Sequence, residues 1–566
     1  MTLIGINIKI LYYEKLLIYR EDLVLTDKNG NFYKPERGSS EKPDHIFLSF
    51  CGDAHTSMCV SWRTDENTDS GYILYSDGKT EKRRQAVSKK IQSDIDRSCY
   101  HWAVMSDLIP GTKYKYTVGD DVNRSDEFSF ETEPENIENF KFIIITDHQK
   151  GHPHQLPDYS TLNAVLKKAL DLNPDARFIL TAGDNCDNGQ NDLQWNGMFS
   201  GAKGIVESIP YMMTTGNHDN RGFLTYFPEP VGKFYLEHAD FFDSQFEYSY
   251  PLNGPDGYKT ENYSFDYGCA HFTVMGINAP EEVADWAAED IESSKKDWKF
   301  GTYHFPIYPV MPEGQNDDGY PWLRKAVEKL DILFEGHEHS FARTFPIKGD
   351  ELFDKPSQGT VHYIAGNAGG NIYHSNAQKV WHSCFFPQEE RTPLYAVAEV
   401  TKTKLKITAY MLDGRIVDEF IIDKEKDEIR PYALAPRYDR IKMTFKGRML
   451  ELSARGLAPE EKDGIWYAPF AVVCQSIGGA VLKEKGKVTI EVYGHRAVFT
   501  ENSNIAFTDR GSIEMNGAVY LKDGQLYIPI DDSAKVFGMQ WYYAKENGFV
   551  NWNTPSEDKP LSKQPE

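Results

Sequence analysis

Long apolar runs are absent from this sequence of 566 residues. Nowhere do about 18 apolar residues follow one another, so we expect no transmembrane helix. Lys9, Glu14, Lys15 and Arg20 interrupt the apolar character of the N-terminal stretch, and the small-residue cleavage site of a signal peptide does not follow it. The location therefore stays open between a cytoplasmic protein and an exported one whose signal lies outside this sequence.

Cysteine is scarce and shows no pattern. The seven cysteines are odd in number and include no C-x-x-C pair, which argues against a zinc ribbon and against a dense disulfide framework. Three of them, Cys51, Cys59 and Cys99, fall in one region. A single disulfide can form there, but the sequence does not select the pair.

Positive charge is also in deficit. The chain has 62 Lys and Arg against 85 Asp and Glu, a formal net charge of -23. Such a chain repels a phosphate backbone, so duplex nucleic acid is not an expected partner. A phosphate-bearing substrate would need cations in its site, which directs attention to metal ligands.

The residues that are present indicate a packed, multidomain protein. Hydrophobic residues make up 40% and aromatic residues 13% of the chain, which is typical of globular domains. After an N-terminal extension (1–44), short alternating runs predict an antiparallel β-sandwich of fibronectin III-like size over residues 45–133. Buried runs alternating with helical stretches predict a central α/β domain over residues 134–425.

An internal repeat follows the central domain. Asp463-Gly-Ile-Trp-Tyr-Ala-Pro-Phe470 recurs sixty positions later as Asp523-Gly-Gln-Leu-Tyr-Ile-Pro-Ile530, and Gly478 matches Gly538 at the same offset. We therefore predict a duplicated α+β or β-rich domain over residues 434–555, followed by a polar tail (556–566).

Five apolar runs of the central domain each end in residues that can bind a metal. Read as parallel strands, they deliver their ligands to one edge of a sheet. The seven candidates are Asp147, Gln149, Asp184, Asn217, His304, His337 and His339. This mixed oxygen and imidazole set suits Mn, Zn or Fe better than Ca or Mg. Seven ligands are too many for one ion, but two ions about 3.5–4 Å apart could share Asp184.

The order of these motifs resembles the calcineurin-like metallophosphoesterases over about residues 140–370. The sandwich, with Met58-Cys-Val-Ser-Trp62, is similar to the N-terminal domain of purple acid phosphatases. The resemblance implies one metal ion on Asp147, Gln149, Asp184 and His339, and a second on Asp184, Asn217, His304 and His337. It also implies that His218 donates a hydrogen bond or a proton to the leaving group, with Asp219 orienting its ring.

Two residues depart from the family patterns. Asp187 stands where purple acid phosphatases have the tyrosine that colours their iron, so no iron-tyrosinate centre is expected. We expect Asp187 to contact the residues that bind the metal ions, without binding an ion itself. Gln149 stands where many members have histidine, so the first metal ion should bind less tightly or differ in kind. His148 is expected to line the substrate entrance or to lie in a solvated loop, as are His152 and His154.

The C-terminal repeat resembles the N-terminal domain of copper amine oxidases, which in bacteria accompanies secreted or wall-associated enzymes. Its implied role is attachment, through contact with a cell-wall or envelope polymer, and this favours a secreted or envelope-associated protein. The repeat has no histidine cluster, so no copper is expected.

Together these features predict a hydrolase of small-molecule phosphate esters, a phosphatase of the acid-phosphatase type. It would use two divalent or trivalent metal ions (Mn, Zn or Fe) to activate water as the nucleophile. Two alternatives remain: a phosphodiesterase or nucleotidase on the same metal site, and a non-catalytic protein that binds an envelope polymer.

Overall fold

The structure is a computed structural model. It describes residues 25–26, 32–33, 38–93, 97–150, 157–220, 239–278, 280–311, 320–349, 351–373, 376–379, 381–388, 392–433, 435, 442–445, 448–450, 457–484, 486–522, 525–544 and 549–553. Most of the N-terminal extension, the polar tail, His152, His154 and the Asp523-Gly524 pair of the repeat lie outside these residues. None of the described helices is long and apolar enough to cross a membrane.

The chain divides into two compact units. The first comprises Met1–Arg343, Lys355–Ala377 and Cys384–Pro431, and the second comprises Thr344–Asp354, Gln378–Ser383 and Tyr432–Glu566. Small two-stranded pairs, β1 (Leu25–Thr26) with β2 (Phe32–Tyr33) and β19 (Ile347–Lys348) with β20 (Glu351–Leu352), lie outside the larger sheets.

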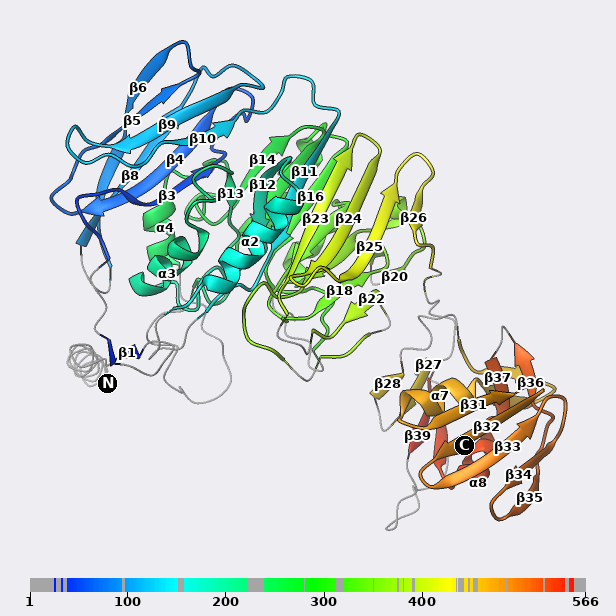
Figure 1. Cartoon of the computed structure of the whole chain (residues 1–566). Coiled ribbons are helices and arrows are strands. Elements are labelled where there is room, and N and C mark those ends of the chain that lie inside the picture. The colour runs from blue at the N-terminus through cyan, green and yellow to red at the C-terminus, as the bar shows by residue number, and fades with distance from the viewer. Residues whose placement is uncertain are drawn as a thin grey trace, which may run out of the picture. The chain divides into compact units, whose positions relative to one another are not determined.

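A β-sandwich opens the first unit (Figure 1). One sheet has the order β3 (Asp44–Ser49), β4 (Met58–Asp65), β8 (Arg97–Met105), β7 (Val87–Gln92). The other has the order β10 (Phe128–Glu131), β9 (Lys113–Gly119), β5 (Tyr72–Ser76), β6 (Glu81–Gln85). Large aromatic side chains are buried on both faces of the first sheet: Trp62 stacks on His101 of the neighbouring strand, and Trp102, on the other face of β8, contacts Tyr248 of the central domain.

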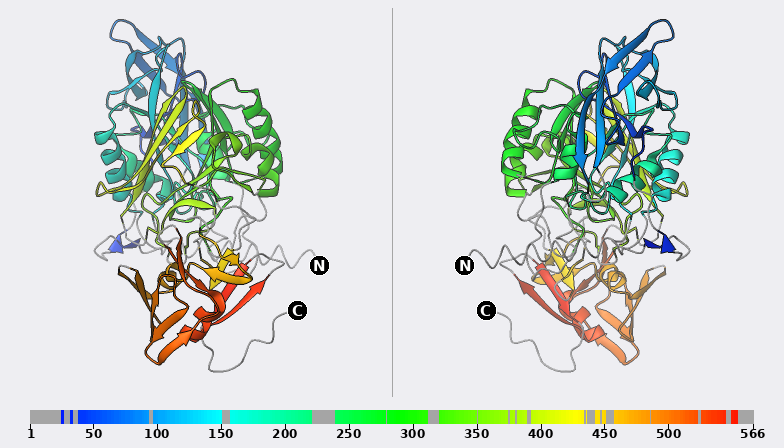
Figure 2. Two further views of the ribbon diagram at one scale, coloured as in Figure 1. Left: turned by 90° about the vertical axis from the view of Figure 1, so that its right-hand side faces the viewer. Right: turned by 90° about the vertical axis from the view of Figure 1, so that its left-hand side faces the viewer.

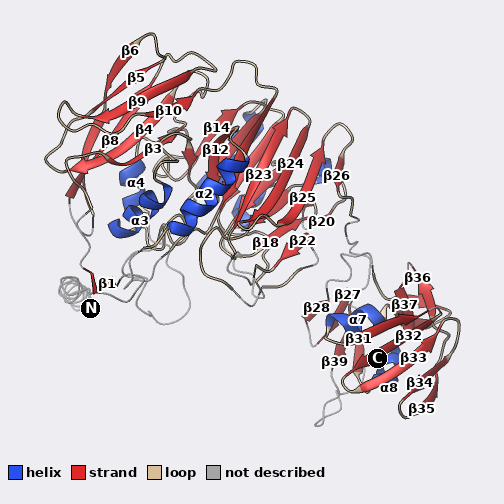
Figure 3. Cartoon of the chain, in the orientation of Figure 1, coloured by secondary structure: helices blue, strands red, loops and turns tan. Residues whose placement is uncertain are grey.

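Two seven-stranded sheets form the central domain (Figure 3). The first has the order β13 (Tyr211–Met212), β12 (Ala176–Thr181), β11 (Asn139–Ile145), β23 (Leu394–Thr401), β24 (Lys404–Met411), β25 (Ile416–Asp423), β26 (Glu428–Arg430). The second has the order β14 (Tyr263–Tyr267), β15 (Ala270–Met275), β16 (Trp298–Tyr303), β17 (Ile332–Glu335), β21 (Val361–Ala365), β18 (Phe341–Thr344), β22 (His382–Phe386). The sheet ends at Arg430, beyond the predicted domain boundary at residue 425.

Phenylalanine rings hold the two sheets face to face. Phe142 of β11 makes an edge contact with Phe272 of β15 and with Phe334 of β17, with ring centroids 5.3 Å and 6.0 Å apart. All three side chains are buried. The high aromatic content of the sequence therefore supplies the layer between the sheets.

Helices cover the outer faces of this sandwich. In Figure 2, α2 (Ser160–Leu172) and α3 (Asp192–Ala202) lie on one side, and α5 (Pro280–Ser293) and α6 (Tyr320–Val327) on the other. A short helix, α4 (Asp240–Phe246), and a 3-10 turn, η2 (Pro356–Gln358), complete the unit. In α2 the spaced apolar residues Leu162, Val165, Leu166 and Ala169 are buried, which is why this sequence forms a helix here.

The second unit repeats one order of elements. β29 (Glu460–Lys462), β30 (Ile465–Ala468), α7 (Phe470–Ser476) and β31 (Ala480–Glu484) recur as β36 (Tyr520–Lys522), β37 (Gln525–Pro529), α8 (Ile530–Phe537) and β38 (Gln540–Ala544). Each element of the second set begins sixty positions after its counterpart, the same offset as the repeat in the sequence. Phe470 and Phe537 stack at 5.3 Å in the core of the unit.

The remaining strands of the second unit complete its sheets. β28 (Arg448–Leu450), β27 (Lys442–Phe445), β39 (Phe549–Asn553) and β38 form one sheet, and β29, β30, β37 and β36 form another. A five-stranded sheet consists of β31, β32 (Lys487–Val492), β33 (His495–Thr500), β34 (Ile505–Thr508) and β35 (Gly511–Glu514).

Candidate metal centre

All seven predicted ligands follow the carboxyl ends of parallel strands. Asp147 and Gln149 follow β11, Asp184 follows β12 and Asn217 follows β13, all in the first sheet. The second sheet contributes His304 after β16, and His337 and His339 after β17. One sheet therefore supplies the oxygen-bearing side chains and the other the imidazoles, and they meet at a shared edge.

The carboxylates and imidazoles fall into two groups that share one residue. The ligand atoms of Asp147, Asp184 and His339 lie within 4.8 Å of one another, as do those of Asp184, His304 and His337. Asp184 Oδ1 is 3.2 Å from His304 Nε2, and Asp147 Oδ1 is 3.2 Å from His339 Nε2. The geometry brings Asp184 between two potential cation sites.

The two amides complete these groups. Asn217 Oδ1 lies 2.9 Å from His337 Nδ1 and 3.1 Å from His304 Nε2. Gln149 Nε2 lies 3.3 Å from Asp184 Oδ2 and 3.2 Å from His339 Nε2. The buried Gln149 Oε1 has no hydrogen-bond partner among the described residues. Turning this amide over would bring the oxygen toward Asp184 and His339, where a cation would satisfy it, so the residues fit a dinuclear centre.

Unusual backbone conformations hold several ligands in place. Asp147, Asp184, His337 and His339 have φ values of 51°, 54°, 71° and 52°, in a region that non-glycine residues rarely adopt. Such residues cost free energy and cluster at functional sites, where the surrounding structure enforces them.

Glycines beside the ligands leave no room for a side chain. A Cβ at Gly336 would lie 2.7 Å from Asp147 Oδ2 and would overlap Thr146 Oγ1, and one at Gly216 would overlap Asp184 Oδ1. This close approach explains why Gly-His and Gly-Asn pairs occur at these strand ends.

Charge is concentrated at this edge. Burial alone would lower the pKa of His304, but Asp184 outweighs it and raises that pKa to about 9. Burial also opposes ionisation of Asp184, yet His304 and His218 hold its pKa well below the usual range. Burial and the neighbouring His304 lower the pKa of His337. Opposed shifts of this kind are typical of functional sites.

His218 lies beside Asp184 and is held by Asp187. Its Nδ1 lies 2.9 Å from the Asp187 carbonyl oxygen and 3.2 Å from the Asp187 carboxylate. Its Nε2 lies 3.8 Å from Asp184 Oδ2, and its backbone N–H donates to Asp184 Oδ1 over 2.8 Å. Asp187 is expected to support the metal ligands, and the contact found here is with His218, which is not one of the seven predicted ligands.

The expected contact between Asp219 and the His218 ring must be corrected. The buried Asp219 carboxylate accepts hydrogen bonds from the backbone N–H groups of Asn185, Cys186 and Gly216. Asp219 therefore ties the loop after β12 to the loop after β13. Burial, and next the charge of Asp184, raise its pKa to about 6.

His148 differs from expectation as well. It is 1% exposed, its Nε2 lies 3.1 Å from the Tyr211 hydroxyl, and burial lowers its pKa to about 3. It is a neutral core residue and not part of a solvated entrance.

Some neighbours of the ligands carry no signal in the sequence. Tyr373 stacks on the His339 ring at 4.3 Å, and the Asn371 carbonyl accepts a hydrogen bond from His339 Nδ1. Both follow the glycine-rich segment 366–370, where Gly370 N–H donates to the Asp147 carbonyl over 2.8 Å. This glycine-rich segment therefore lies directly beside the ligands.

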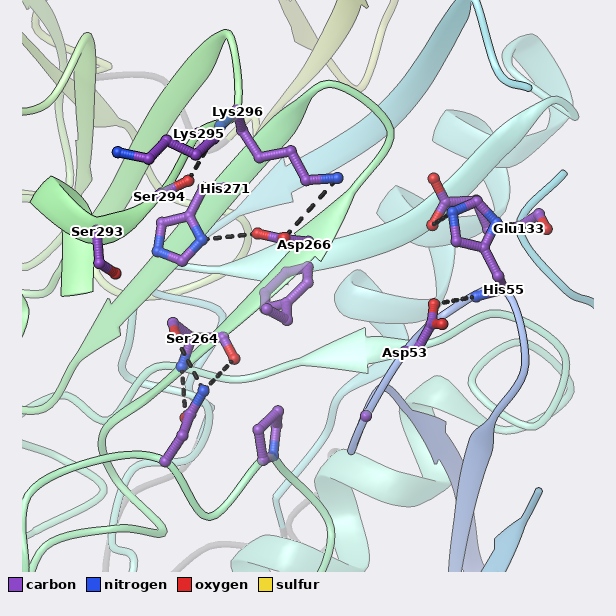
Figure 4. A pocket seen from close by; sticks show the side chains of 14 residues that line it. Asp53, His55, Glu133, Ser264, Asp266, His271, Ser293, Ser294, Lys295 and Lys296 are labelled. Carbon is purple, nitrogen blue, oxygen red and sulfur yellow. Dashed lines mark hydrogen bonds and ion pairs between the residues drawn. The ribbon is translucent and has the colours of Figure 1, made fainter. Parts of the chain in front are cut away.

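A polar pocket lies near the amino end of β15, away from the carboxyl ends of the strands that carry the ligands (Figure 4). It has a volume of about 680 Å³, and Asp53, His55, Glu133, Asp266 and His271 are among the residues that line it. His271 is in β15 near the amino end of that strand, whereas the ligands follow the carboxyl ends. The pocket is therefore separate from the candidate metal centre.

Comparisons with known families match all three domains. Residues 43–132 match the model described as purple acid phosphatase, N-terminal domain. Residues 140–341 match calcineurin-like phosphoesterase, and residues 451–551 match copper amine oxidase N-terminal domain. The domain composition implied by the sequence motifs is confirmed.

The similar proteins include two from Arabidopsis thaliana. The chain is 25% identical over 383 residues to probable inactive purple acid phosphatase 1 of Arabidopsis thaliana, covering 59% of each protein. It is 24% identical over 332 residues to purple acid phosphatase 21 of the same species, covering 54% of this chain and 67% of that protein. The chain thus spans about three fifths of the length of the first relative.

The fold is also found in a solved structure. The purple acid phosphatase PPD1 from yellow lupin (Lupinus luteus) seeds superposes with a TM-score of 0.56 at 17% identity, over 68% of this chain and 74% of that one. At this identity the likeness shows that the two chains share a fold.

Proposed function

We propose that this protein is a dinuclear-metal-dependent hydrolase of small-molecule phosphate esters, with phosphatase activity. The observation that carries the proposal is the position of Asp184, shared by two ligand groups and adjacent to His218. A binding protein has no need of an imidazole beside a shared metal ligand.

One ion would be held by Asp147, Gln149, Asp184 and His339, and the other by Asp184, Asn217, His304 and His337. When bound, two such cations offset the negative charge of a phosphate ester and activate water for attack. Mn, Zn and Fe are the candidates, because the ligand set mixes oxygen and imidazole nitrogen. Asp187 in place of tyrosine argues against a purple iron centre.

His218 is the proposed proton donor. Its Nδ1–H is engaged by Asp187, which fixes the ring so that Nε2 faces the side of the ligands. A protonated Nε2 can donate to the leaving oxygen as the ester bond breaks. Asp219 does not act on the substrate directly. Its role is to hold the loops from which Asp184 and Asn217 project.

The C-terminal domain is the proposed point of attachment. Its match to copper amine oxidase N-terminal domains, and the bacterial occurrence of such domains on wall-associated enzymes, favour a secreted or envelope-associated protein that contacts a cell-wall or envelope polymer. Co-sedimentation of the protein with isolated cell walls tests this; loss of pelleting when residues 434–566 are deleted is the expected result.

Assays with an aryl phosphate monoester and an aryl phosphate diester test the activity. After chelation, Mn, Zn or Fe is added back to the full chain. We expect metal-dependent turnover of the monoester in preference to the diester. A preference for the diester would favour the phosphodiesterase or nucleotidase alternative. No turnover of either, with any of the metals bound, would favour a non-catalytic binding protein.

A further inference from the structure

Cys51 and Cys59 both lie at the base of the β3–β4 hairpin. Ser49 of β3 is the cross-strand partner of Cys59, and Cys51 follows Ser49 by two positions. Gly52 is close to Ser57, since a Cβ at Gly52 would lie 3.0 Å from the Ser57 Oγ. Cys51 therefore lies diagonally across the hairpin from Cys59, a placement at which side chains of neighbouring strands can meet, and its thiol influences the pKa of Cys59.

The third cysteine of the region is out of reach. Cys99 of β8 is opposite Thr64, whereas Cys59 is opposite Val104. Five strand residues separate these positions by about 16 Å at roughly 3.3 Å each. A disulfide requires Cα atoms within about 7 Å, so Cys99 cannot pair with Cys59 in this fold.

We propose that Cys51 and Cys59 are a redox-active thiol pair, which a low-molecular-weight disulfide such as oxidised glutathione converts into an intramolecular disulfide. Cys51 is partly exposed and Cys59 is buried, so Cys51 reacts first: its sulfur bonds to one sulfur of the oxidant and one small thiol leaves. The Cys59 sulfur then attacks the Cys51 sulfur, the mixed disulfide breaks and a second small thiol leaves. The protein gives up two electrons and two protons, and the oxidant takes up both.

The second step is the slower one. The neighbouring Cys51 thiol, and then burial, raise the pKa of the Cys59 thiol, which lowers the fraction present as thiolate. Cys59 Sγ also lies 3.4 Å from the Tyr248 carbonyl of the central domain, a contact that the disulfide would replace.

The bridge would close the base of a loop that contacts the link between the two domains. Ala54 accepts a hydrogen bond from the Glu133 N–H over 3.0 Å, and His55 Nδ1 lies 3.2 Å from the Glu133 carbonyl oxygen. Asp53, His55 and Glu133 lie on one side of the pocket in Figure 4. Oxidation should therefore stabilise this junction, and it should leave the ligand edge unchanged.

Peptide mapping of the full chain tests the pairing. Trypsin leaves Cys51 and Cys59 in one peptide, residues 38–63, and Cys99 in another, residues 98–113. After incubation with oxidised glutathione, alkylation under denaturing conditions and digestion without reductant, we expect peptide 38–63 to be lighter by two hydrogens and unalkylated. Cys59→Ser should instead retain a glutathione adduct on Cys51, and Cys474→Ser, in the second unit, should map as the parent protein does.

Three results would overturn the proposal. These are alkylation of both cysteines in peptide 38–63, glutathione on both of them, or a cross-link between peptides 38–63 and 98–113. Differential scanning calorimetry of the oxidised and reduced protein gives the melting temperature as a second readout. The reduced form should melt a few degrees lower, and this difference should be absent in Cys59→Ser.

Discussion

Asn217 lies where two imidazoles from the second sheet approach the first. Its Oδ1 is within 3.1 Å of both His304 and His337 nitrogens. Asn217→Ala should lower kcat/KM by at least about 100-fold, because a lost ligand costs more than the 10- to 100-fold typical of residues behind the ligands. Its free energy of unfolding should fall by only about 1–2 kcal/mol. Kinetics and urea unfolding, with exposed Asn67→Ala as the control, measure both. A loss of folding as severe as the loss of activity would show that Asn217 has a structural role instead.

Asp187 is argued to act through His218. Asp187→Asn should lower kcat by roughly 10- to 100-fold with little change in KM, as part of the contribution of a positioned acid. The loss should be larger for an alkyl phosphate than for an aryl phosphate, whose leaving group needs less protonation. Asp219→Asn is the comparison. It should lower kcat for both substrates to the same extent, because Asp219 holds the loops that carry the ligands. An equal loss on both substrates for Asp187→Asn would remove it from proton transfer.

The sequence predicted the ligand types, but not the contacts between side chains. Metal ligands occur in short motifs at strand ends, so their order can be read directly from the sequence. The partners of Asp219 come from loops more than thirty positions apart, and Tyr373 meets His339 only through the turn after β21. Such contacts depend on how the loops fold, and the spacing of apolar residues in the sequence does not predict that.

At the level of elements, a buried ion pair joins the sandwich to the central domain. Arg63 of β4 donates to Asp192 at the start of α3 over 2.9 Å, and also to Asp44 over 2.8 Å. Asp192 is fully buried. Arg63→Met should therefore cost about 3–5 kcal/mol in the free energy of unfolding, because it removes the Arg63 cation from the buried Asp192 carboxylate.

Two variants check that reason by urea unfolding. The double variant Arg63→Met with Asp192→Asn should recover part of the loss, since the buried Asp192 charge is removed together with its Arg63 partner. Lys115→Ala, which breaks the exposed pair with Glu127, should cost less than about 1 kcal/mol. If the double variant is as unstable as Arg63→Met alone, uncompensated charge is not the cause.

A second link joins β14, β15 and α5. His271 Nδ1 lies 2.7 Å from Asp266, and its Nε2 lies 2.8 Å from Asp290. Burial opposes the charge on His271, but the two carboxylates raise its pKa to about 9. The folded pKa is above the unfolded value, so this stabilisation is complete below about pH 6.5 and is lost as the pH rises through 9.

The free energy of unfolding should therefore decrease between about pH 7 and pH 9, and His271→Gln should flatten that slope. Denaturant unfolding across this range measures it, with His495→Gln in the second unit as the control. A slope that is unchanged in His271→Gln would assign the pH dependence to other groups.

Strand type was predictable, and strand partners were not. The run ending at His337 predicts the strand found at Ile332–Glu335, because continuous burial is typical of parallel strands. Nothing in such a run says which sheet it joins. The strands before Asp184 and His304 therefore look alike in sequence, yet they belong to different sheets.

For the whole molecule, the two compact units separate two proposed tasks. The first unit contains all the candidate ligands, and the second contains the repeated elements. Domain composition was predictable from motifs spread along the chain. The extension of the first sheet to Arg430 was not, because β24 to β26 carry no ligand and only their antiparallel pairing reveals their place.

The metal content of the chain, purified without chelators, tests the central claim most directly. We predict two metal ions per chain by elemental analysis, and fewer than one in Asp184→Ala, because this residue serves both ligand groups. Asp187→Asn should keep two ions as the matched control. A single ion in the parent protein, or two ions retained by Asp184→Ala, would contradict a dinuclear centre built on Asp184.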